Sequence, residues 1–264
     1  MMTFNPQTWI AEQYLGRAEF GRTIPLRLSC SRQSDDVTLA RDSAEFFAKF
    51  VGLPEVIEQS LFAEMLGNVL ARACGITTGE PAFIEIDEPF SELLRQVDVR
   101  LKPSVGVGSR SLGSGIGPPT FGRMSEEQTQ DAARIYLFDL LVQNPDRRVD
   151  NPNCVVVARQ LAAIDFESCF SFLYPIVGNS AHPWEVSRHR IASRHLFHED
   201  LTGADIKWPS MVRNVMMSAR DVLADCELWM PHAWIRWKER VDHHFAMLQR
   251  HENELIFEVV RSLT

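Results

Sequence analysis

The chain has 264 residues, a net charge of −8 at pH 7 and a pI near 5.5. This acidic balance argues against an extended nucleic-acid surface, so no nucleic-acid partner is expected. No apolar run reaches the roughly 18 to 20 residues that cross a bilayer, and the first residues lack the charged and apolar regions of a signal peptide. We therefore expect a cytoplasmic protein without membrane contact.

Cysteine usage and overall composition also favour an intracellular globular chain. The hydrophobic content is 45% and the charged content 23%, which are ordinary values, and the length suffices for one bilobal unit or two small domains. The cysteines are odd in number, scattered, and mostly within apolar stretches: Cys30, Cys74, Cys154, Cys169 and Cys226. We expect buried thiols and no disulfide framework.

The first predicted elements are two paired strands, at residues 14–20 and 23–30. The polar stretch 29–36 follows, and its backbone donors and hydroxyl groups suit a turn that covers phosphates. A plain polar hairpin loop explains the same residues equally well. The candidate phosphate contacts in this stretch are Ser31, Arg32, Gln33 and Ser34.

A lysine in an apolar strand and a glutamate in the next helix form the second candidate group. The chain has only four lysines against 23 arginines, and Lys49 lies in the alternating apolar segment 45–51. Its compact ammonium group can reach between phosphates, although a lysine at a strand edge can also extend to solvent. The helix predicted at residues 58–74, ended by Gly75, contains Glu64, which we expect to pair with Lys49 unless it is a solvated helix charge.

Further strands are predicted at residues 83–87 and 97–102, with a boundary near Pro103. Residues 104–121 then carry five glycines and the pair Pro118 and Pro119. These glycines do not form a dinucleotide-binding fingerprint. A mobile loop that acts as a lid and a simple flexible connector are both consistent with them.

The most informative segment begins with an amphipathic helix predicted at residues 131–142. It leads into the polar loop 144–153, a β-branched strand at 154–158, and an apolar run that ends at Asp165. Asp146 is followed five residues later by Asn151, and this spacing suits a carboxylate that orients a hydroxyl group beside oxygen ligands for a hard cation. Turn residues of the same types are common, but the flanking helix and strands favour phosphoryl transfer.

The C-terminal part is predicted to be mostly helical, with a terminal run at residues 234–263. Its expected core residues are Trp237, Val241, Phe245, Leu248 and Leu255. A basic group precedes it and can attract an acidic partner or form a solvated helix face; it comprises Arg188, His189, Arg190, Arg194 and His195. The pairs His195 with His198 and His243 with His244 lack a third well-spaced ligand for zinc.

These motifs together resemble the HipA-like kinases, in particular the short branch that contains only the kinase core. The resemblance is most specific at residues 138–147 and 164–166. It implies that Asp146 is the catalytic base, that Asn151 and Asp165 bind Mg²⁺, and that Lys49 with Glu64 positions the phosphates of ATP. It also makes Ser31 and Ser34 candidates for autophosphorylation.

The sequence departs from conventional kinases at two points. No glycine-rich G-x-G-x-x-G motif precedes Lys49, and Glu167 stands where such kinases have glycine. The second departure puts conventional switching of this loop in doubt.

The resulting expectation is an α+β, bilobal kinase-like fold with an N-lobe at residues 1–102 and a C-lobe at 103–264. Its expected activity is ATP- and Mg²⁺-dependent phosphorylation of a serine or threonine on a protein. A toxin-like or defence role is a further option, as is a small partner or an antitoxin-like protein. The alternatives are a pseudokinase that serves as a nucleotide-binding interaction module, a small-molecule kinase, or a nucleotidyltransferase.

Overall fold

The computed structural model describes residues 5–18, 23–32, 42–113, 119, 124–174 and 181–264. The contacts within the chain divide it into two compact units. The N-terminal unit contains Asn5–Met65 and Gly79–Gly113, and the C-terminal unit contains Leu66–Thr78 and Ser114–Thr264. Because this division follows contact density only, the lobe boundary expected at residue 102 stays a prediction.

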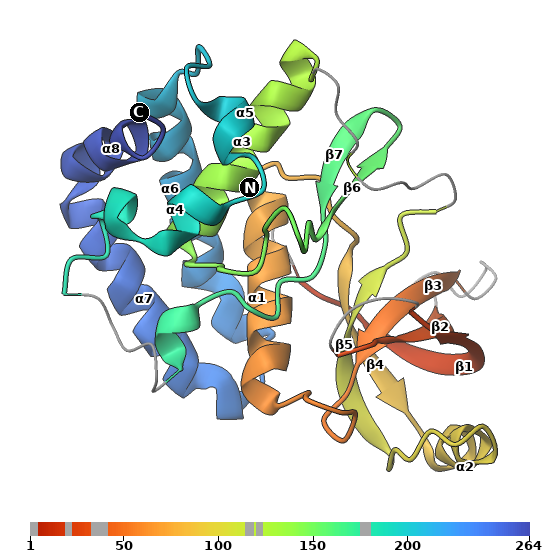
Figure 1. Cartoon of the computed structure of the whole chain (residues 1–264). Coiled ribbons are helices and arrows are strands. Elements are labelled where there is room, and N and C mark those ends of the chain that lie inside the picture. Colours follow the sequence, from red (N-terminus) through yellow and green to blue (C-terminus); the bar gives the residue numbers. More distant parts are fainter. Residues whose placement is uncertain (1–4, 19–22, 33–41, 114–118, 120–123, 175–180) are drawn as a thin grey trace. The chain divides into compact units, whose positions relative to one another are not determined.

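The N-terminal unit is built around one five-stranded sheet with the strand order β1-β2-β3-β5-β4. The sheet closes into a barrel because β1 also pairs with β4 (Figure 1). This pair is parallel, whereas all other strand pairs of the sheet are antiparallel. Alternate residues of β2 point inward, and Leu26, Leu28 and Cys30 are fully buried. The strands are β1 (Thr8–Arg17), β2 (Leu26–Arg32), β3 (Asp42–Lys49), β4 (Pro81–Ile86) and β5 (Ser104–Arg110).

The strand predicted at residues 97–102 is wrong, and a helix that was not predicted precedes it. Helix α2 (Glu88–Gln96) begins where the Asp87 side chain accepts a hydrogen bond of 2.9 Å from the Phe90 N–H. Val97 caps this helix, and the next residues form irregular chain. Val99 and Leu101 are both buried, so they reproduce the alternation of a strand without pairing to one.

The loop predicted at residues 104–121 is also partly wrong, because its first seven residues form strand β5. A Cβ atom at Gly106 would lie 2.3 Å from the Lys49 carbonyl oxygen, and one at Gly108 would lie 2.7 Å from Ile84 Cγ1. These glycines therefore allow β5 to pack closely against its neighbours. Residues 114–118 and 120–121 of the predicted loop lie outside the described part of the chain.

Helix α1 (Glu58–Ala73) starts in the N-terminal unit and ends in the C-terminal one. It closes at Gly75, which has a φ of 76° and allows the Ile76 N–H to bond the Ala71 carbonyl at 3.0 Å. The predicted helix at residues 58–74 and its glycine stop are confirmed.

The C-terminal unit contains a short hairpin and is otherwise mostly helical (Figure 1). Helix α3 begins with a capping box, in which Ser125 and Gln128 bond each other's backbone N–H groups. The hairpin consists of β6 (Cys154–Val157) and β7 (Gln160–Ala163). The α-helices are α3 (Glu126–Leu141), α4 (Arg190–Arg194), α5 (His198–Leu201), α6 (Trp208–Asp225), α7 (Ile235–Arg250) and α8 (Glu252–Arg261). The four 3-10 turns of the described chain are η1 (Ser171–Leu173), η2 (Val186–Arg188), η3 (Cys226–Leu228) and η4 (His232–Trp234).

The core of this unit agrees with the predicted apolar stripes. All five expected core residues of the terminal run are buried, although the run breaks into α7 and α8 at His251. The five cysteines are free and buried as expected, and burial raises the pKa of the Cys74 thiol to about 12. Such thiols stay protonated and unreactive near neutral pH.

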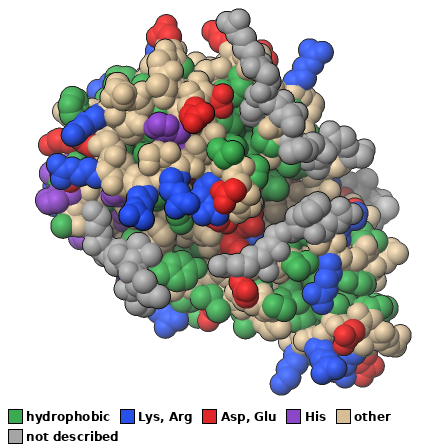
Figure 2. Space-filling model, in the orientation of Figure 1, with side chains coloured by type: hydrophobic (Ala, Val, Ile, Leu, Met, Phe, Trp, Pro, Cys, Tyr) green, Lys and Arg blue, Asp and Glu red, His purple; other side chains and the backbone are tan. Residues whose placement is uncertain are grey.

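The surface carries mixed charge on the face that Figure 2 draws. A short row of Lys and Arg side chains there ends beside acidic ones, and apolar side chains lie between charged groups of both signs. Among the described residues, no helix combines the length and apolar character that a membrane span requires.

Candidate active site

Lys49 and Glu64 form a buried ion pair in the N-terminal unit. Lys49 is the last residue of β3, Glu64 lies in the second turn of α1, and Lys49 Nζ is 2.9 Å from Glu64 Oε2. Each residue is only 5% exposed, so neither is a solvated surface charge. Because opposite charges attract strongly inside a protein, the ion pair helps to hold both side chains in place.

Two of the residues expected to cover phosphates, Ser31 and Arg32, are the last residues of β2. Ser31 is buried and its hydroxyl donates to Glu12 Oε1 at 2.5 Å. Arg32 binds Asp42 at 3.0 Å and lies over the Trp9 ring. Gln33 and Ser34 lie outside the described residues. The phosphate contact of both residues stays a prediction.

Asp146 lies in the loop between α3 and β6 and is held from several sides. Its N–H donates to Asn144 Oδ1 at 3.1 Å, and its carboxylate oxygen Oδ2 accepts from Asn153 Nδ2 at 3.3 Å. Asn151 Nδ2 donates to the Asp146 carbonyl at 3.2 Å. Within the described chain the Asn151 Oδ1 oxygen receives no hydrogen bond, so it can serve as a metal ligand.

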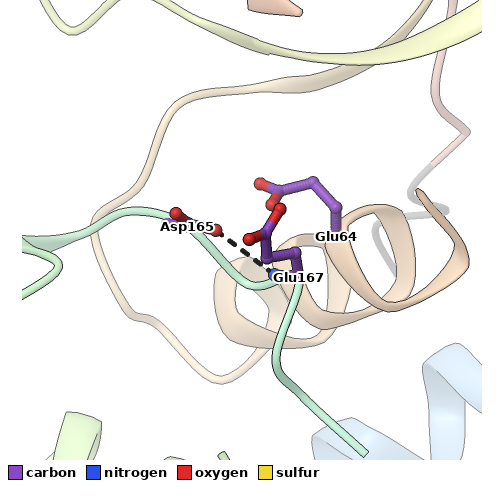
Figure 3. A group of neighbouring side chains, drawn as sticks. All are labelled: Glu64, Asp165 and Glu167. Carbon is purple, nitrogen blue, oxygen red and sulfur yellow. Dashed lines mark hydrogen bonds between the residues drawn. The ribbon is translucent and has the colours of Figure 1, made fainter. Parts of the chain in front are cut away.

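Asp165 follows β7 with a left-handed backbone at a φ of 59°, a strained conformation that is common at functional sites. The Glu167 N–H donates to Asp165 Oδ1 at 3.4 Å, and the two carboxylates have oxygen atoms within 4.8 Å of each other. Figure 3 draws this pair together with Glu64, which extends from helix α1. Carboxylate oxygens are ligands that Mg²⁺ prefers, so Asp165 and Glu167 suit such an ion, and the role of Asn151 as a further ligand stays a prediction.

Comparison with known proteins assigns the family. The sequence model of the HipA-like kinases matches residues 37–258, which include Lys49, Asp146 and Asp165. The chain belongs to the HipA-like kinase family. No curated protein sequence matches it significantly.

A solved structure supports the kinase-like α+β fold. The Helicobacter pylori proinflammatory kinase CtkA is 12% identical to the chain, with a TM-score of 0.50 and coverage of 97% of each chain. At this identity the likeness concerns the fold alone.

In this HipA-like kinase the sequence did not predict a buried cluster of charged and polar side chains that includes Arg147, the residue after Asp146. Asp139 on α3 binds Arg147 at 2.6 Å and His195 at 3.0 Å, and all three side chains are inaccessible to solvent. The signal was present, because Asp139 interrupts an otherwise apolar helix face, and a buried carboxylate needs charged or hydrogen-bonding partners. What the sequence could not supply was the identity of those partners.

The structure also divides the basic group of residues 188–195. Arg188 is exposed and binds Glu185 at 2.8 Å, whereas His195 is 3% exposed and belongs to the buried cluster. His198 contacts the Ser262 carbonyl at 3.0 Å. The interpretation of all five residues as one solvated face is therefore wrong for His195.

Proposed function

We propose that the chain is a cytoplasmic, ATP- and Mg²⁺-dependent kinase that phosphorylates a serine or threonine hydroxyl of a protein. It would use a two-lobed catalytic domain, in which Lys49 and Glu64 position the nucleotide. Asp146, Asn151 and Asp165 would carry out the transfer. Membership of the HipA-like kinase family supports the general class, and the arguments below concern the finer assignment.

The observation that carries the proposal is the buried Lys49–Glu64 pair, with 2.9 Å between Nζ and Oε2. Burying two charges costs more than an apolar pair of similar size would, so this pair favours a role in binding over one in stability. In protein kinases a strand lysine held by a helix glutamate binds the phosphates of ATP and must be in place for transfer.

Asp146 would act as the general base. Its carboxylate takes the proton of the acceptor hydroxyl as that oxygen forms a bond to the γ-phosphorus, while the bond from this phosphorus to the bridging oxygen breaks and ADP leaves. The hydrogen bond from Asn153 to Asp146 Oδ2 would orient the carboxylate for this step.

The oxygen atoms of Asn151, Asp165 and Glu167 would hold Mg²⁺. When bound, this ion supplies positive charge that neutralises the phosphate oxygens during transfer. The Glu167 N–H, which donates to Asp165 Oδ1, would keep that carboxylate oriented.

The deciding experiment incubates the purified chain with ATP labelled on either the α- or the γ-phosphate, with and without cell lysate, and with Mg²⁺ or a chelator. We expect transfer of the γ-label alone, to serine or threonine, only with the metal. Transfer of the α-label would indicate a nucleotidyltransferase. Nucleotide binding without transfer of either label would contradict the kinase proposal and favour an interaction module.

A further inference from the structure

The buried cluster behind Asp146 is centred on the Asp139 carboxylate. Its Oδ1 oxygen accepts from Asn144 Nδ2 at 2.9 Å, and Oδ2 accepts from Arg147 Nε at 2.6 Å and contacts His195 Nε2 at 3.0 Å. Helix α3 therefore presents one carboxylate to three side chains that come from the catalytic loop and from the segment between α4 and α5.

The hydrogen bonds define the charge of each member. His195 Nδ1 accepts from the Phe197 N–H at 3.2 Å, so the ring proton lies on Nε2 and is donated to Asp139. His195 is thus neutral, and burial, only partly offset by Asp139, keeps its pKa below the usual range. The negative Asp139 and the positive Arg147 balance each other within the core.

Arg147 connects Asp139 to the loop that carries Asp146 and to the segment that carries Asp165. Its Nη1 group donates to the Asn153 and Ile164 carbonyls, which lie at the end of the catalytic loop and directly before Asp165. Its guanidinium carbon also lies 5.6 Å from the centre of the Phe166 ring. A single buried side chain therefore spans residues 153, 164 and 166.

Asn144 and His195 complete the connections. Asn144 links Asp139 to the backbone of Asp146, because its Oδ1 oxygen accepts the Asp146 N–H. The Leu196 N–H donates to the Arg147 carbonyl at 3.0 Å, and Arg148 and His195 form an antiparallel bridge. The segment that carries His195 is thus tied to the loop by both side chain and backbone.

We propose that Asp139 is a positioning residue for phosphoryl transfer, which fixes the positions of Asp146 and Asp165 through Asn144 and Arg147. His195, in the segment between α4 and α5, holds the Asp139 carboxylate in place. The proposal rests on the kinase function proposed above. Asp139 does not touch the reacting atoms; it acts through the residues that do. Loss of its contacts lowers kcat while the KM for ATP changes little, because the Lys49–Glu64 pair belongs to the other unit.

The first test replaces Asp139 by Asn, which keeps the shape and removes the charge. We expect kcat to fall roughly 10- to 100-fold, the range by which loss of a supporting group or a displacement of about 1 Å slows a reaction. The KM for ATP should stay within about threefold. Because this variant leaves Arg147 without its counter-charge, it can fail to fold, and a milder pair of variants is needed.

That pair is His195→Leu and His195→Gln. Leu removes both polar contacts of the ring, whereas Gln offers an N–H donor for Asp139 and a carbonyl acceptor, so their difference measures the hydrogen bonding at this position. We expect kcat of His195→Leu to lie roughly tenfold below that of His195→Gln. Lys238→Met is the control, since it breaks a different, half-buried ion pair with Glu227 and Asp242 in the same unit and should leave kcat unchanged.

Hydrogen exchange without nucleotide supplies a second readout that does not depend on activity. In His195→Leu the amides of residues 144–153 and 164–167 should exchange faster than in His195→Gln or Lys238→Met. Equal exchange and equal kcat in all three variants would overturn the proposal, as would a loss of kcat that follows the melting temperature alone. If the wild-type chain transfers no phosphate, the kinase function fails, and the exchange result still decides whether Asp139 and His195 hold the loop.

Discussion

Asp146 and Asp150 lie four residues apart in one loop but have different surroundings. Arg148 forms an ion pair with both, at 3.8 Å from Asp146 Oδ1 and 3.2 Å from Asp150 Oδ1. The Asp146 side chain is 31% exposed and also accepts a hydrogen bond from Asn153, whereas that of Asp150 is 73% exposed. At the scale of single residues, Asp146 is therefore a partly buried carboxylate with a fixed orientation, whereas Asp150 is a surface carboxylate.

Replacing Asp146 by Asn should abolish most phosphate transfer and leave ATP binding intact. Removal of a positioned general base typically slows a reaction about 10²- to 10⁴-fold without weakening binding of the ground state. Transfer of γ-labelled phosphate and ATP titration by calorimetry measure the two effects. Asp150→Asn is the matched control, and equal activity of both variants would remove Asp146 from the role of base.

The neighbouring asparagines should separate metal binding from orientation of the base. Asn151→Ala removes a proposed Mg²⁺ ligand together with the hydrogen bond to the Asp146 carbonyl, so kcat should fall and a higher Mg²⁺ concentration should be needed for half-maximal activity. Asn153→Ala removes the hydrogen bond to Asp146 Oδ2, so it should lower kcat with an unchanged Mg²⁺ requirement. Activity measured against Mg²⁺ concentration tests both variants. An unchanged requirement in Asn151→Ala would place the metal elsewhere.

At the scale of secondary structure, strand β5 links barrel packing to the position of Lys49. Gly106 pairs with Ile84 of β4, and a Cβ atom added to it would meet the Lys49 carbonyl oxygen of β3 at 2.3 Å. The backbone of the lysine that we assign to phosphate binding is therefore held by a glycine almost 60 residues away in sequence.

Gly106→Ala should both destabilise the chain and weaken nucleotide binding. Overpacking of this kind costs about 1–3 kcal/mol, and the required shift of the Lys49 backbone should move its ammonium group. Urea unfolding and ATP titration measure the two effects. Val105→Thr, at a side chain that is 55% exposed in the same strand, should change neither. If Gly106→Ala destabilises the chain without affecting ATP binding, β5 supports the barrel only.

At the scale of the whole molecule, buried histidines couple stability to pH. His244 on α7 stacks on Phe172, with 4.2 Å between ring centres, and its Nε2 contacts the Leu141 carbonyl at 2.8 Å. Burial lowers its pKa to about 4, and the bond to Leu141 offsets this only in part. The adjacent His243 is exposed, so the chain contains its own control.

His244 should make the chain less stable as the pH falls from about 6.5 towards 4. In this window the unfolded chain takes up a proton that the folded chain does not bind, which costs at most roughly 1.4 kcal/mol per pH unit. Above pH 6.5 the effect vanishes, because neither state binds the proton. Urea unfolding at several pH values should show a flatter pH dependence for His244→Gln than for His243→Gln. Identical curves for the two variants would contradict the prediction.

Local sequence patterns determined several parts of this protein. The apolar spacing of α1 and its glycine stop, the β-branched strand β6 and the buried stripe of α7 each depend on periodicity within one segment. The spacing of Asp146, Asn151 and Asp165 is likewise local to one loop and one hairpin, and their roles stay a prediction. Lys49 could be singled out for the same reason. A lysine in an apolar strand is unusual, and this can be recognised from the strand alone, before its partner Glu64 is known.

Only the tertiary structure decided which distant groups meet. Residues 97–102 alternate like a strand, yet Val99 and Leu101 are buried in irregular chain, and Gly106 and Gly108 lie in a strand because neighbouring strands leave no room for a Cβ atom. Asp139 and His195 are 56 residues apart, and His195 looked like part of a surface cluster until its contact with Asp139 was placed. The physical reason is that periodicity encodes which face of an element is buried, whereas pairing across the chain depends on how the folded elements pack against one another.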